Sequence, residues 1–224
     1  MKLYIMRHSE TDWNKEHRIQ GRTDIHLNLN GMKIAALAGD GMKDIPIDVC
    51  FSSPLMRAQE TAAIVVARNP HFVEGGSRIM LDDRLMEIAF GIWEGQDGSE
   101  GTMGENRELF REFFVGLGGT YMPEGAEDPK NVIRRSQEFL DDISARPELQ
   151  DKTILIVTHG FTTRCLLSRF YEDQDDYFHK PGVLYNCQTA IAEKDASGKL
   201  VLTDPARLFY DEAYAKNYYK GSMT

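Results

Sequence analysis

Three short apolar segments, each followed directly by polar residues, constrain the fold of this chain more than any other feature. Lys2–Met6, Asp48–Phe51 and Thr153–Thr158 are brief and rich in β-branched or aromatic residues, which is typical of buried strands. Helical patterns at Asn30–Lys43 and Pro54–Arg68 follow the first and second segments along the chain. Strands that are separated by helices predict right-handed βαβ units around a mainly parallel sheet.

Other local patterns complete this prediction. Apolar residues at helical spacing predict three more helices: Glu105–Val115, Asn131–Ala145 and Gly160–Phe170. Ser53 is the expected N-cap of the helix at Pro54–Arg68, because proline is favoured at the first helical position. A hairpin is predicted at Ala192–Val201, turning at residues 196–198.

The whole chain is expected to form one α/β domain over residues 1–224. We predict a three-layer α/β/α sandwich with a mainly parallel central sheet. A helical insertion at about residues 96–150 is expected to cover one edge of the core, and a tail occupies about residues 205–224.

The charge and the apolar content of the chain exclude several classes of protein. With 26 Lys and Arg against 35 Asp and Glu, the formal net charge is −9, so we expect neither a nucleic-acid nor a membrane partner. No apolar run reaches the roughly 18 residues that span a bilayer, and the apolar N-terminal stretch is too short for a signal peptide. Cys50, Cys165 and Cys187 match no disulfide or zinc pattern. We therefore expect a cytoplasmic protein.

Arginines and histidines follow the carboxyl ends of the predicted strands. Arg7 and His8 follow the first strand, Arg57 lies just beyond the second, and His159 follows the third. In a parallel sheet these ends share one edge, where α/β proteins bind their ligands. Arginine grips phosphate oxygens, a neutral imidazole can carry a phosphoryl group, and a protonated imidazole can stabilise its charge. These residues together predict phosphoryl chemistry.

A general acid for the leaving oxygen is expected in the segment Leu85–Gly95. This segment offers two carboxylates, Glu87 and Glu94, among apolar and aromatic residues. Apolar surroundings let a carboxyl group keep its proton near neutral pH.

The chain resembles the histidine phosphatase superfamily, the phosphoglycerate mutase-like proteins, in four segments that stand in the family's order. These segments are Arg7-His8-Ser9-Glu10-Thr11-Asp12-Trp13-Asn14 with Arg18-Ile19-Gln20-Gly21, Ser52-Ser53-Pro54-Leu55-Met56-Arg57, Leu85-Met86-Glu87-Ile88 with Phe90-Gly91-Ile92-Trp93-Glu94-Gly95, and Val157-Thr158-His159-Gly160. The resemblance covers about residues 2–66, 81–95 and 152–165.

The resemblance implies a nucleophilic His8 that becomes phosphohistidine, and it makes Glu87 the proton donor rather than Glu94. The other residues that it implies are a phosphate pocket of Arg7, Arg57 and His159, and substrate contacts at Asn14, Gln20, Gly21 and Gly160. Neither a metal nor a cofactor is implied. One position departs from the family, which usually has glycine after the nucleophilic histidine, where this chain has Ser9.

Three functions fit these residues. The favoured one is a metal-independent phosphomonoester hydrolase, a histidine acid-type phosphatase, that acts on a small phosphorylated metabolite. The segment at residues 90–95 resembles the phosphatase branch. The alternatives are a cofactor-dependent phosphoglycerate mutase-type phosphotransfer and a catalytically impaired phosphate-binding protein, for which Ser9 is the only support. The sequence fixes neither the substrate nor the oligomeric state.

Overall fold

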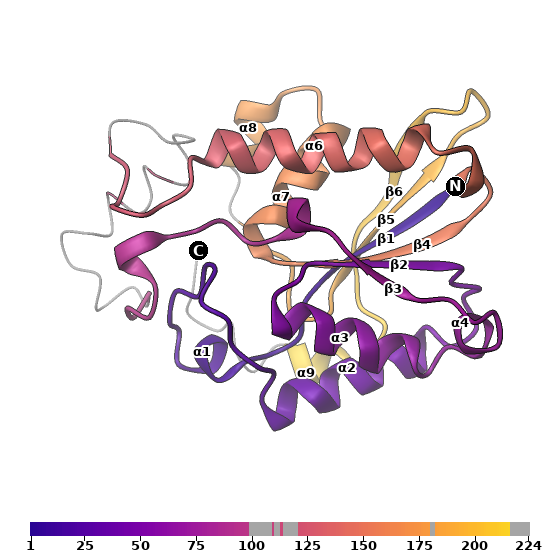
Figure 1. Ribbon diagram of the computed structural model, residues 1–224, viewed down its shortest axis with the longest axis horizontal. Coiled ribbons are helices and arrows are strands. Elements are labelled where there is room, and N and C mark those ends of the chain that lie inside the picture. The colour runs from indigo at the N-terminus through magenta and orange to yellow at the C-terminus, as the bar shows by residue number, and fades with distance from the viewer. Residues whose placement is uncertain (99–108, 110–112, 114–120, 180–181, 216–224) are drawn as a thin grey trace.

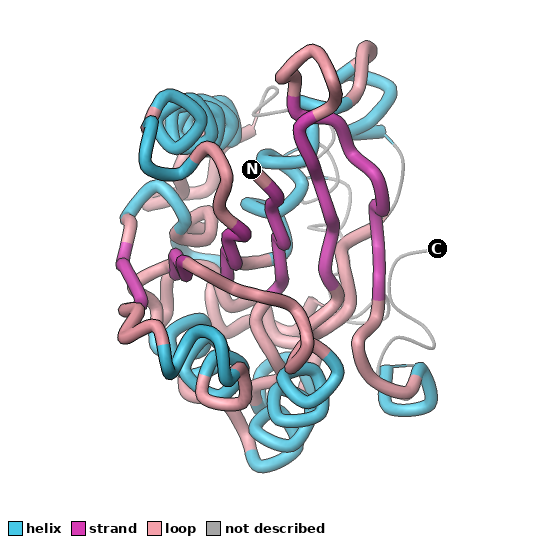
Figure 2. The backbone as a smooth tube through the Cα atoms, turned by 90° about the vertical axis from the view of Figure 1, so that its right-hand side faces the viewer, coloured by secondary structure: helices cyan, strands magenta, loops and turns pink. Residues whose placement is uncertain are grey.

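The computed structural model describes residues 1–98, 109, 113, 121–179 and 182–215 of the chain. Within these residues, six strands form one sheet in the order β3-β2-β4-β1-β5-β6. Helices cover both faces of this sheet, as Figures 1 and 2 show from two directions. The chain thus folds as a three-layer α/β/α sandwich, as predicted.

The strands are β1 (Lys2–Arg7), β2 (Val49–Ser52), β3 (Ile79–Leu81), β4 (Thr153–Thr158), β5 (Thr189–Lys194) and β6 (Leu200–Arg207). The α-helices are α1 (Asp12–Lys15), α2 (Leu29–Gly41), α3 (Met56–Val66), α4 (Pro70–Glu74), α6 (Pro129–Ala145), α7 (Gly160–Leu167), α8 (Gln174–His179) and α9 (Glu212–Ala215). Short 3-10 turns are η1 (Asp83–Leu85), η2 (Gly91–Trp93), η3 (Pro147–Leu149) and η4 (Ser168–Phe170).

The sheet is parallel over its first four strands. β1 pairs with β4, β4 with β2 and β2 with β3, all in parallel. β5 runs antiparallel to β1 and forms the predicted hairpin with β6. The turn of this hairpin is closed by Asp195, whose side chain accepts hydrogen bonds from the backbone of Ser197 and Lys199.

Alternating side chains of β1 pack into both helical layers. Leu3 and Ile5 lie in one core cluster with residues of α6 and α7, and Tyr4 and Met6 lie in another with residues of α2 and α3. Each of these four side chains is at most 5% exposed. Full burial of a large apolar side chain contributes about 1.5–3 kcal/mol, so the two clusters hold the strand ends in fixed positions.

Several local predictions are wrong. α3 begins at Met56 with Leu55 as its N-cap, two residues later than predicted, and the hydroxyl oxygen of Ser53 accepts the backbone N–H of Leu55 while the hydroxyl group contacts His159. α6, the second predicted helix of the insertion, packs on a face of the sheet and not over its edge. β3 and α4 were not predicted.

Two further predictions concern other parts of the chain. The predicted helix at Glu105–Val115 lies outside the described residues, apart from residues 109 and 113. In the predicted tail, β6 continues to Arg207, and α9 forms at Glu212–Ala215.

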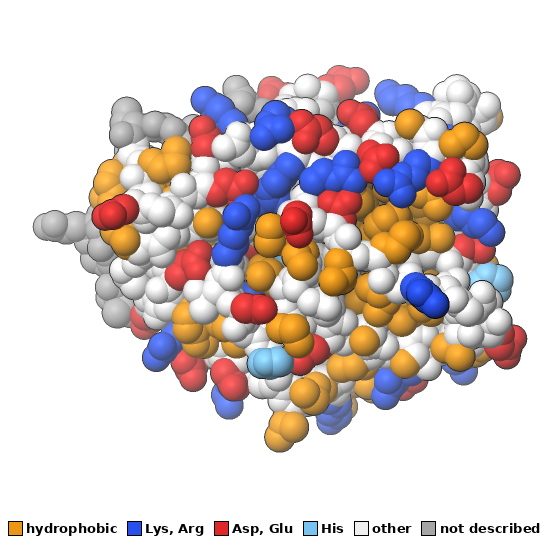
Figure 3. All heavy atoms as spheres, in the orientation of Figure 1, with side chains coloured by type: hydrophobic (Ala, Val, Ile, Leu, Met, Phe, Trp, Pro, Cys, Tyr) orange, Lys and Arg blue, Asp and Glu red, His pale blue; other side chains and the backbone are white. Residues whose placement is uncertain are grey.

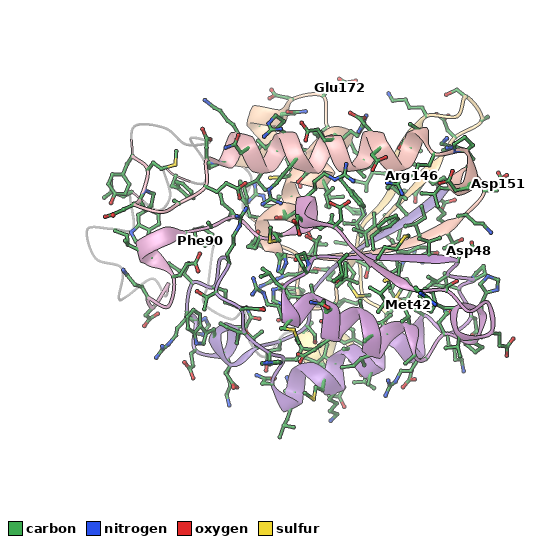
Figure 4. The ribbon with its side chains drawn as sticks, viewed as in Figure 1. Met42, Asp48, Phe90, Arg146, Asp151 and Glu172 are labelled. Carbon is green, nitrogen blue, oxygen red and sulfur yellow. The ribbon has the colours of Figure 1, made fainter. Side chains whose placement is uncertain are left out.

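The carboxyl ends of β1, β2 and β4 meet at one edge of the sheet. Figure 4 places Asp48 and Asp151, which precede β2 and β4, at one end of the molecule, and Phe90 toward the opposite end. Arg7 of β1 pairs with Thr158 of β4, so the residues that follow these two strands are neighbours. This edge is where parallel α/β sheets bind ligands.

Candidate active site

His8 follows β1 directly and is 3% exposed. Its Nδ1 atom lies 2.6 Å from the carbonyl oxygen of Ser9, which can only accept a hydrogen bond. Nδ1 therefore carries the ring proton, and Nε2 keeps an unshared electron pair. Burial, with Arg57 and Arg7 close by, holds the pKa of His8 well below its ordinary value. The ring is thus neutral, with a free electron pair, which is the form that a histidine needs to attack phosphorus.

His159 follows β4, and its ring lies 5.1 Å from that of His8 between centroids. The side chain is fully buried, and Nε2 lies 2.7 Å from the hydroxyl oxygen of Ser53. Burial, with Arg57 and His8 nearby, holds the pKa of His159 well below its ordinary value. The ring is therefore neutral at neutral pH in the protein without a ligand, and a protonated second imidazole beside a bound phosphoryl group stays a prediction.

Two arginines supply that positive charge. Arg57 is fully buried and donates to the carbonyl oxygens of Gly21 at 2.6 Å and Thr23 at 3.0 Å. Burial lowers the pKa of Arg57 to about 10, so the guanidinium stays charged at neutral pH. Arg7 donates to the carbonyl oxygen of Leu184 at 2.6 Å. Backbone carbonyls thus hold both guanidinium groups in place.

Glu87 lies in the loop between η1 and η2, and its carboxylate contacts the first turn of α7. Its Oε1 atom accepts hydrogen bonds from the backbone N–H groups of Ile88 and Thr162, each at 3.1 Å, while the Thr162 hydroxyl group donates its hydrogen to the carbonyl oxygen of Met86 at 2.7 Å. Oε2 accepts one from the backbone of Phe161, also at 3.1 Å. The expectation of apolar surroundings is wrong for this carboxyl group, because backbone amide groups at the N-terminus of α7 contact it.

Gly160 lies beside Glu87 and Arg7, and the atom that a Cβ there would crowd is a methyl group of Val183 at 2.7 Å. A Cβ atom at Gly160 would lie 3.6 Å from Oε2 of Glu87 and 3.9 Å from Nε of Arg7. The structure therefore brings together at one sheet edge two histidines, two arginines and a carboxylate that are far apart in the sequence.

Comparison with known proteins explains this arrangement. The family model of the histidine phosphatase superfamily (branch 1) matches residues 3–203. The chain belongs to the histidine phosphatase superfamily. It is accordingly an enzyme of the phosphatase or mutase type, and the predicted family is confirmed.

Relatives of this chain are named as phosphatases and as mutases. It is 31% identical to a "Probable phosphoglycerate mutase GpmB" of Escherichia fergusonii over 170 residues, 75% of this chain and 74% of the relative. Among solved structures, Bacillus stearothermophilus YhfR is 31% identical with a TM-score of 0.76, over 91% of this chain and 95% of that one. A phosphoserine phosphatase of Entamoeba histolytica, in complex with 3-phosphoglyceric acid, is 27% identical with a TM-score of 0.72, over 92% and 96%.

Ser9, the departure from the family pattern, fits its position without strain. Its hydroxyl group donates to the carbonyl oxygen of Gly31 at 2.7 Å, and its backbone N–H donates to Thr61. The described non-glycine residues with positive φ are His17 and Cys187, so Ser9 does not need the conformational freedom of glycine. The hydroxyl group is therefore engaged with α2 in this histidine phosphatase.

The carboxylate of Glu94 stabilises the loop at residues 21–23, whose carbonyl oxygens bind Arg57. Its carboxylate accepts hydrogen bonds from the backbone of Arg22, Thr23 and Phe90 at 2.8–3.0 Å, and from the Thr23 hydroxyl group. The donors of Arg22 and Thr23 fix the segment that follows Gly21, and the donor of Phe90 ties it to the loop before η2. This use of the carboxylate separates Glu94 from Glu87, which lies beside Arg7 and Gly160.

The other predicted substrate contacts have different surroundings. The Oδ1 atom of Asn14 accepts hydrogen bonds from Thr11, with which Asn14 caps α1. Gln20 is 9% exposed, and its side-chain oxygen has no hydrogen-bond partner among the described residues. Gly21 has a φ of +56° and contributes its carbonyl oxygen to Arg57. Their contact with substrate stays a prediction.

Two residues of the site were missed from the sequence. Ser53 bonds to His159, and Asn186 donates to the carbonyl oxygen of His8 at 3.0 Å and to Oδ1 of Asn14 at 3.5 Å. The position of Ser53 directly after a strand could have indicated that it belongs to the site. Asn186 lies just before β5, and no pattern in the sequence connects it with His8.

Charges of both signs alternate on the face shown in Figure 3, where Lys and Arg side chains lie among Asp and Glu. Arg84 pairs with Asp82 and Asp142, and Arg146 also pairs with Asp142. In the part of the chain that the structure describes, His, Cys, Asp and Glu form no group of three that could hold a metal. No helix in that part is long and apolar enough to cross a membrane.

Proposed function

We propose that this histidine phosphatase is a metal-independent phosphomonoester hydrolase that acts through a phosphohistidine at His8. The observation that carries the proposal is the hydrogen bond from Nδ1 of His8 to the carbonyl oxygen of Ser9, since it leaves the electron pair on Nε2. Arg7, Arg57 and His159 surround the place where a phosphoryl group would meet Nε2. The substrate is a small phosphorylated metabolite.

In the first step, Nε2 of His8 forms a bond to phosphorus while the bond from phosphorus to the ester oxygen breaks. The guanidinium groups of Arg7 and Arg57 bind the oxygens of the transferred group, and they supply charge throughout the step. Protonated Glu87 gives its proton to the departing alkoxide, which leaves as an alcohol. We assign this proton to Oε2, because Oε2 accepts one backbone hydrogen bond whereas Oε1 accepts two.

In the second step, water attacks the phosphorus of the phosphohistidine. Glu87, now a carboxylate, accepts a proton from the water, and the bond from phosphorus to Nε2 breaks. Inorganic phosphate leaves, and His8 and Glu87 return to their starting states. Every bond and proton is thus accounted for by His8, Glu87 and water.

Phosphate release from a panel of phosphomonoesters tests this proposal. The panel contains phosphoserine, 3-phosphoglycerate, sugar phosphates and nucleoside monophosphates, each measured with excess EDTA and compared with the His8→Ala variant. We expect turnover that survives EDTA and is abolished in His8→Ala. Turnover that requires an added metal, or that persists in His8→Ala, would contradict the proposal.

A mutase is the second candidate, because the 31% identical relative from Escherichia fergusonii is named a probable phosphoglycerate mutase. In that reaction the phosphohistidine returns its phosphoryl group to another hydroxyl group of the bound acid instead of to water. Conversion of 3-phosphoglycerate to 2-phosphoglycerate, primed with a bisphosphoglycerate, distinguishes the two. We expect phosphate release to exceed isomer formation.

We do not favour the third hypothesis, an impaired phosphate-binding protein, because Ser9 was its only support. It depended on crowding of the pocket by Ser9, whose hydroxyl group is instead bonded to Gly31. The proposed enzyme acts on small metabolites in the cytoplasm and needs no nucleic acid or membrane.

A further inference from the structure

Ser53 joins two parts of the active site. It follows β2, where its backbone N–H donates to the carbonyl oxygen of Val157 in β4 at 3.0 Å. Its hydroxyl oxygen lies 2.7 Å from Nε2 of His159 and 3.3 Å from the backbone nitrogen of Leu55. Ser53 and His159 are both fully buried. Their contact is therefore fixed by the sheet and shielded from solvent.

The hydrogen-bond donors decide the direction of the Ser53–His159 bond. The backbone N–H of Leu55 already donates to the Ser53 oxygen, so the hydroxyl hydrogen is available for a different acceptor. Among the described residues, the hydroxyl group has Nε2 of His159 as the only acceptor in range. If Nε2 carried the proton instead, the hydroxyl hydrogen would be buried without a partner, which costs about 1–3 kcal/mol.

The opposite nitrogen of the ring then carries the proton. Nδ1 of His159 is buried and has no hydrogen-bond partner within the described residues. It lies across the ring from Ser53, and the neighbouring charges come from Arg57 and Arg7. A neutral ring with a proton on Nδ1 can donate to a phosphoryl oxygen without adding a further positive charge to the pocket.

We propose that Ser53 is a positioning residue, whose hydroxyl group donates to Nε2 of His159 and so holds the proton on Nδ1 for a phosphoryl oxygen. The role toward phosphate rests on the proposed function. The tautomer itself does not, because it is a property of the protein without substrate.

The tautomer can be measured directly. In protein labelled with ¹⁵N-histidine, long-range ¹H–¹⁵N correlation spectra distinguish a ring protonated on Nδ1 from one protonated on Nε2. The signals that disappear in His159→Gln are those of His159. We expect a neutral ring with its proton on Nδ1. A proton on Nε2, or a doubly protonated ring at neutral pH, would overturn the proposal without any change to Ser53.

The variant Ser53→Ala, with Ser52→Ala as its matched control, tests whether the Ser53 hydroxyl group sets the tautomer of His159. Ser52 is also fully buried, but its hydroxyl group donates to the backbone carbonyl of Ser53 and not to His159. In Ser53→Ala we expect loss of the Nδ1-protonated form and a fall in kcat of roughly 10- to 100-fold, less than the ~10²–10³-fold for removal of a direct donor. Ser52→Ala should keep the tautomer and most of kcat.

Two results would overturn the role of Ser53. One is a folded Ser53→Ala protein with the tautomer and kcat of the wild type. The other is an equal loss of kcat in Ser52→Ala, which would show that any buried cavity here is harmful. If the wild type hydrolyses no phosphomonoester, the proposed function fails, and the spectra still decide whether Ser53 sets the tautomer.

Discussion

Glu94 lies directly against Gly21: a Cβ atom at Gly21 would stand 2.1 Å from Oε1 of Glu94. The carbonyl oxygen of Gly21 accepts a hydrogen bond from Arg57. The contact of two residues that are far apart in the sequence therefore fixes the position of a guanidinium group in the phosphate pocket. The predictions for Gly21→Ala and Glu94→Gln below depend on this link from Glu94 through Gly21 to Arg57.

Gly21→Ala should impair both stability and activity. The new Cβ meets Glu94, and φ of +56° is unfavourable for alanine by about 1–2 kcal/mol. The matched control is Gly76→Ala, which has a φ of +65° but no atom within 4 Å of the added Cβ. We expect both variants to lower Tm and only Gly21→Ala to raise KM. Equal KM values in the two variants would contradict the link between Gly21 and the position of Arg57.

The two carboxylates of the segment at residues 85–95 should differ in their kinetic effects. Glu87→Gln removes the proposed acid, so kcat should fall by ~10²–10⁴-fold with little change in KM. Glu94→Gln places an amide group against the backbone N–H groups of Arg22 and Thr23. It should mainly raise KM, through Arg57, and leave the pH profile of kcat unchanged. Steady-state kinetics of both variants check this, and the reverse ranking would make Glu94 the acid.

Ser9→Gly restores the residue that is usual in the family. The variant loses the hydrogen bond to Gly31, which contributes about 0.5–1.5 kcal/mol, and the backbone gains freedom in the unfolded state. We expect lower stability in urea and a kcat close to that of the wild type. A large increase in kcat would show that Ser9 restrains the enzyme.

Stability should fall on acidification because His8 and His159 are buried as neutral rings. Burial lowers the pKa of both in the folded protein, so below about pH 6.5 the unfolded chain binds more protons, and unfolding becomes easier as pH falls. Each ring contributes a slope of up to about 1.4 kcal/mol per pH unit.

The variant His8→Asn/His159→Asn should show a flatter fall in the free energy of unfolding between pH 6.5 and 5. His26→Asn is its control. The pKa of His26 is raised by its hydrogen bond to Glu60, so the contribution of this pair is lost as pH rises. Equal slopes in wild type and double variant would contradict the neutral rings.

The sequence predicts the sheet edge well because parallel strands place their carboxyl ends together. Arg7 ends β1, and His8 and His159 directly follow β1 and β4, so their convergence needs only the order of strands and helices. The surroundings of Glu87 were predicted wrongly, because they depend on the amide groups of α7, which is distant in the sequence. Local composition could not reveal that contact.

The start of α3 shows why local helix signals failed at the site. Ser53 and Pro54 have the residue types of a helix N-terminus, but the hydroxyl group of Ser53 bonds to His159 across the sheet. The hydroxyl oxygen of Ser53 still accepts the backbone N–H of Leu55, so the helix start is displaced by two residues, and the tertiary contact with His159 leaves no local mark in the sequence. The same holds for Asn186, whose link to His8 depends on β5 lying beside β1.

The most direct test of the central claim is the position of the phosphoryl group on the enzyme during turnover. The protein is mixed with a phosphomonoester substrate, quenched in alkali and examined by ³¹P NMR and by mass spectrometry of its peptides. We predict one phosphoryl group on Nε2 of His8, absent from His8→Ala. Turnover without a phosphorylated His8, or a phosphoryl group on Nδ1 or on another residue, would contradict the account.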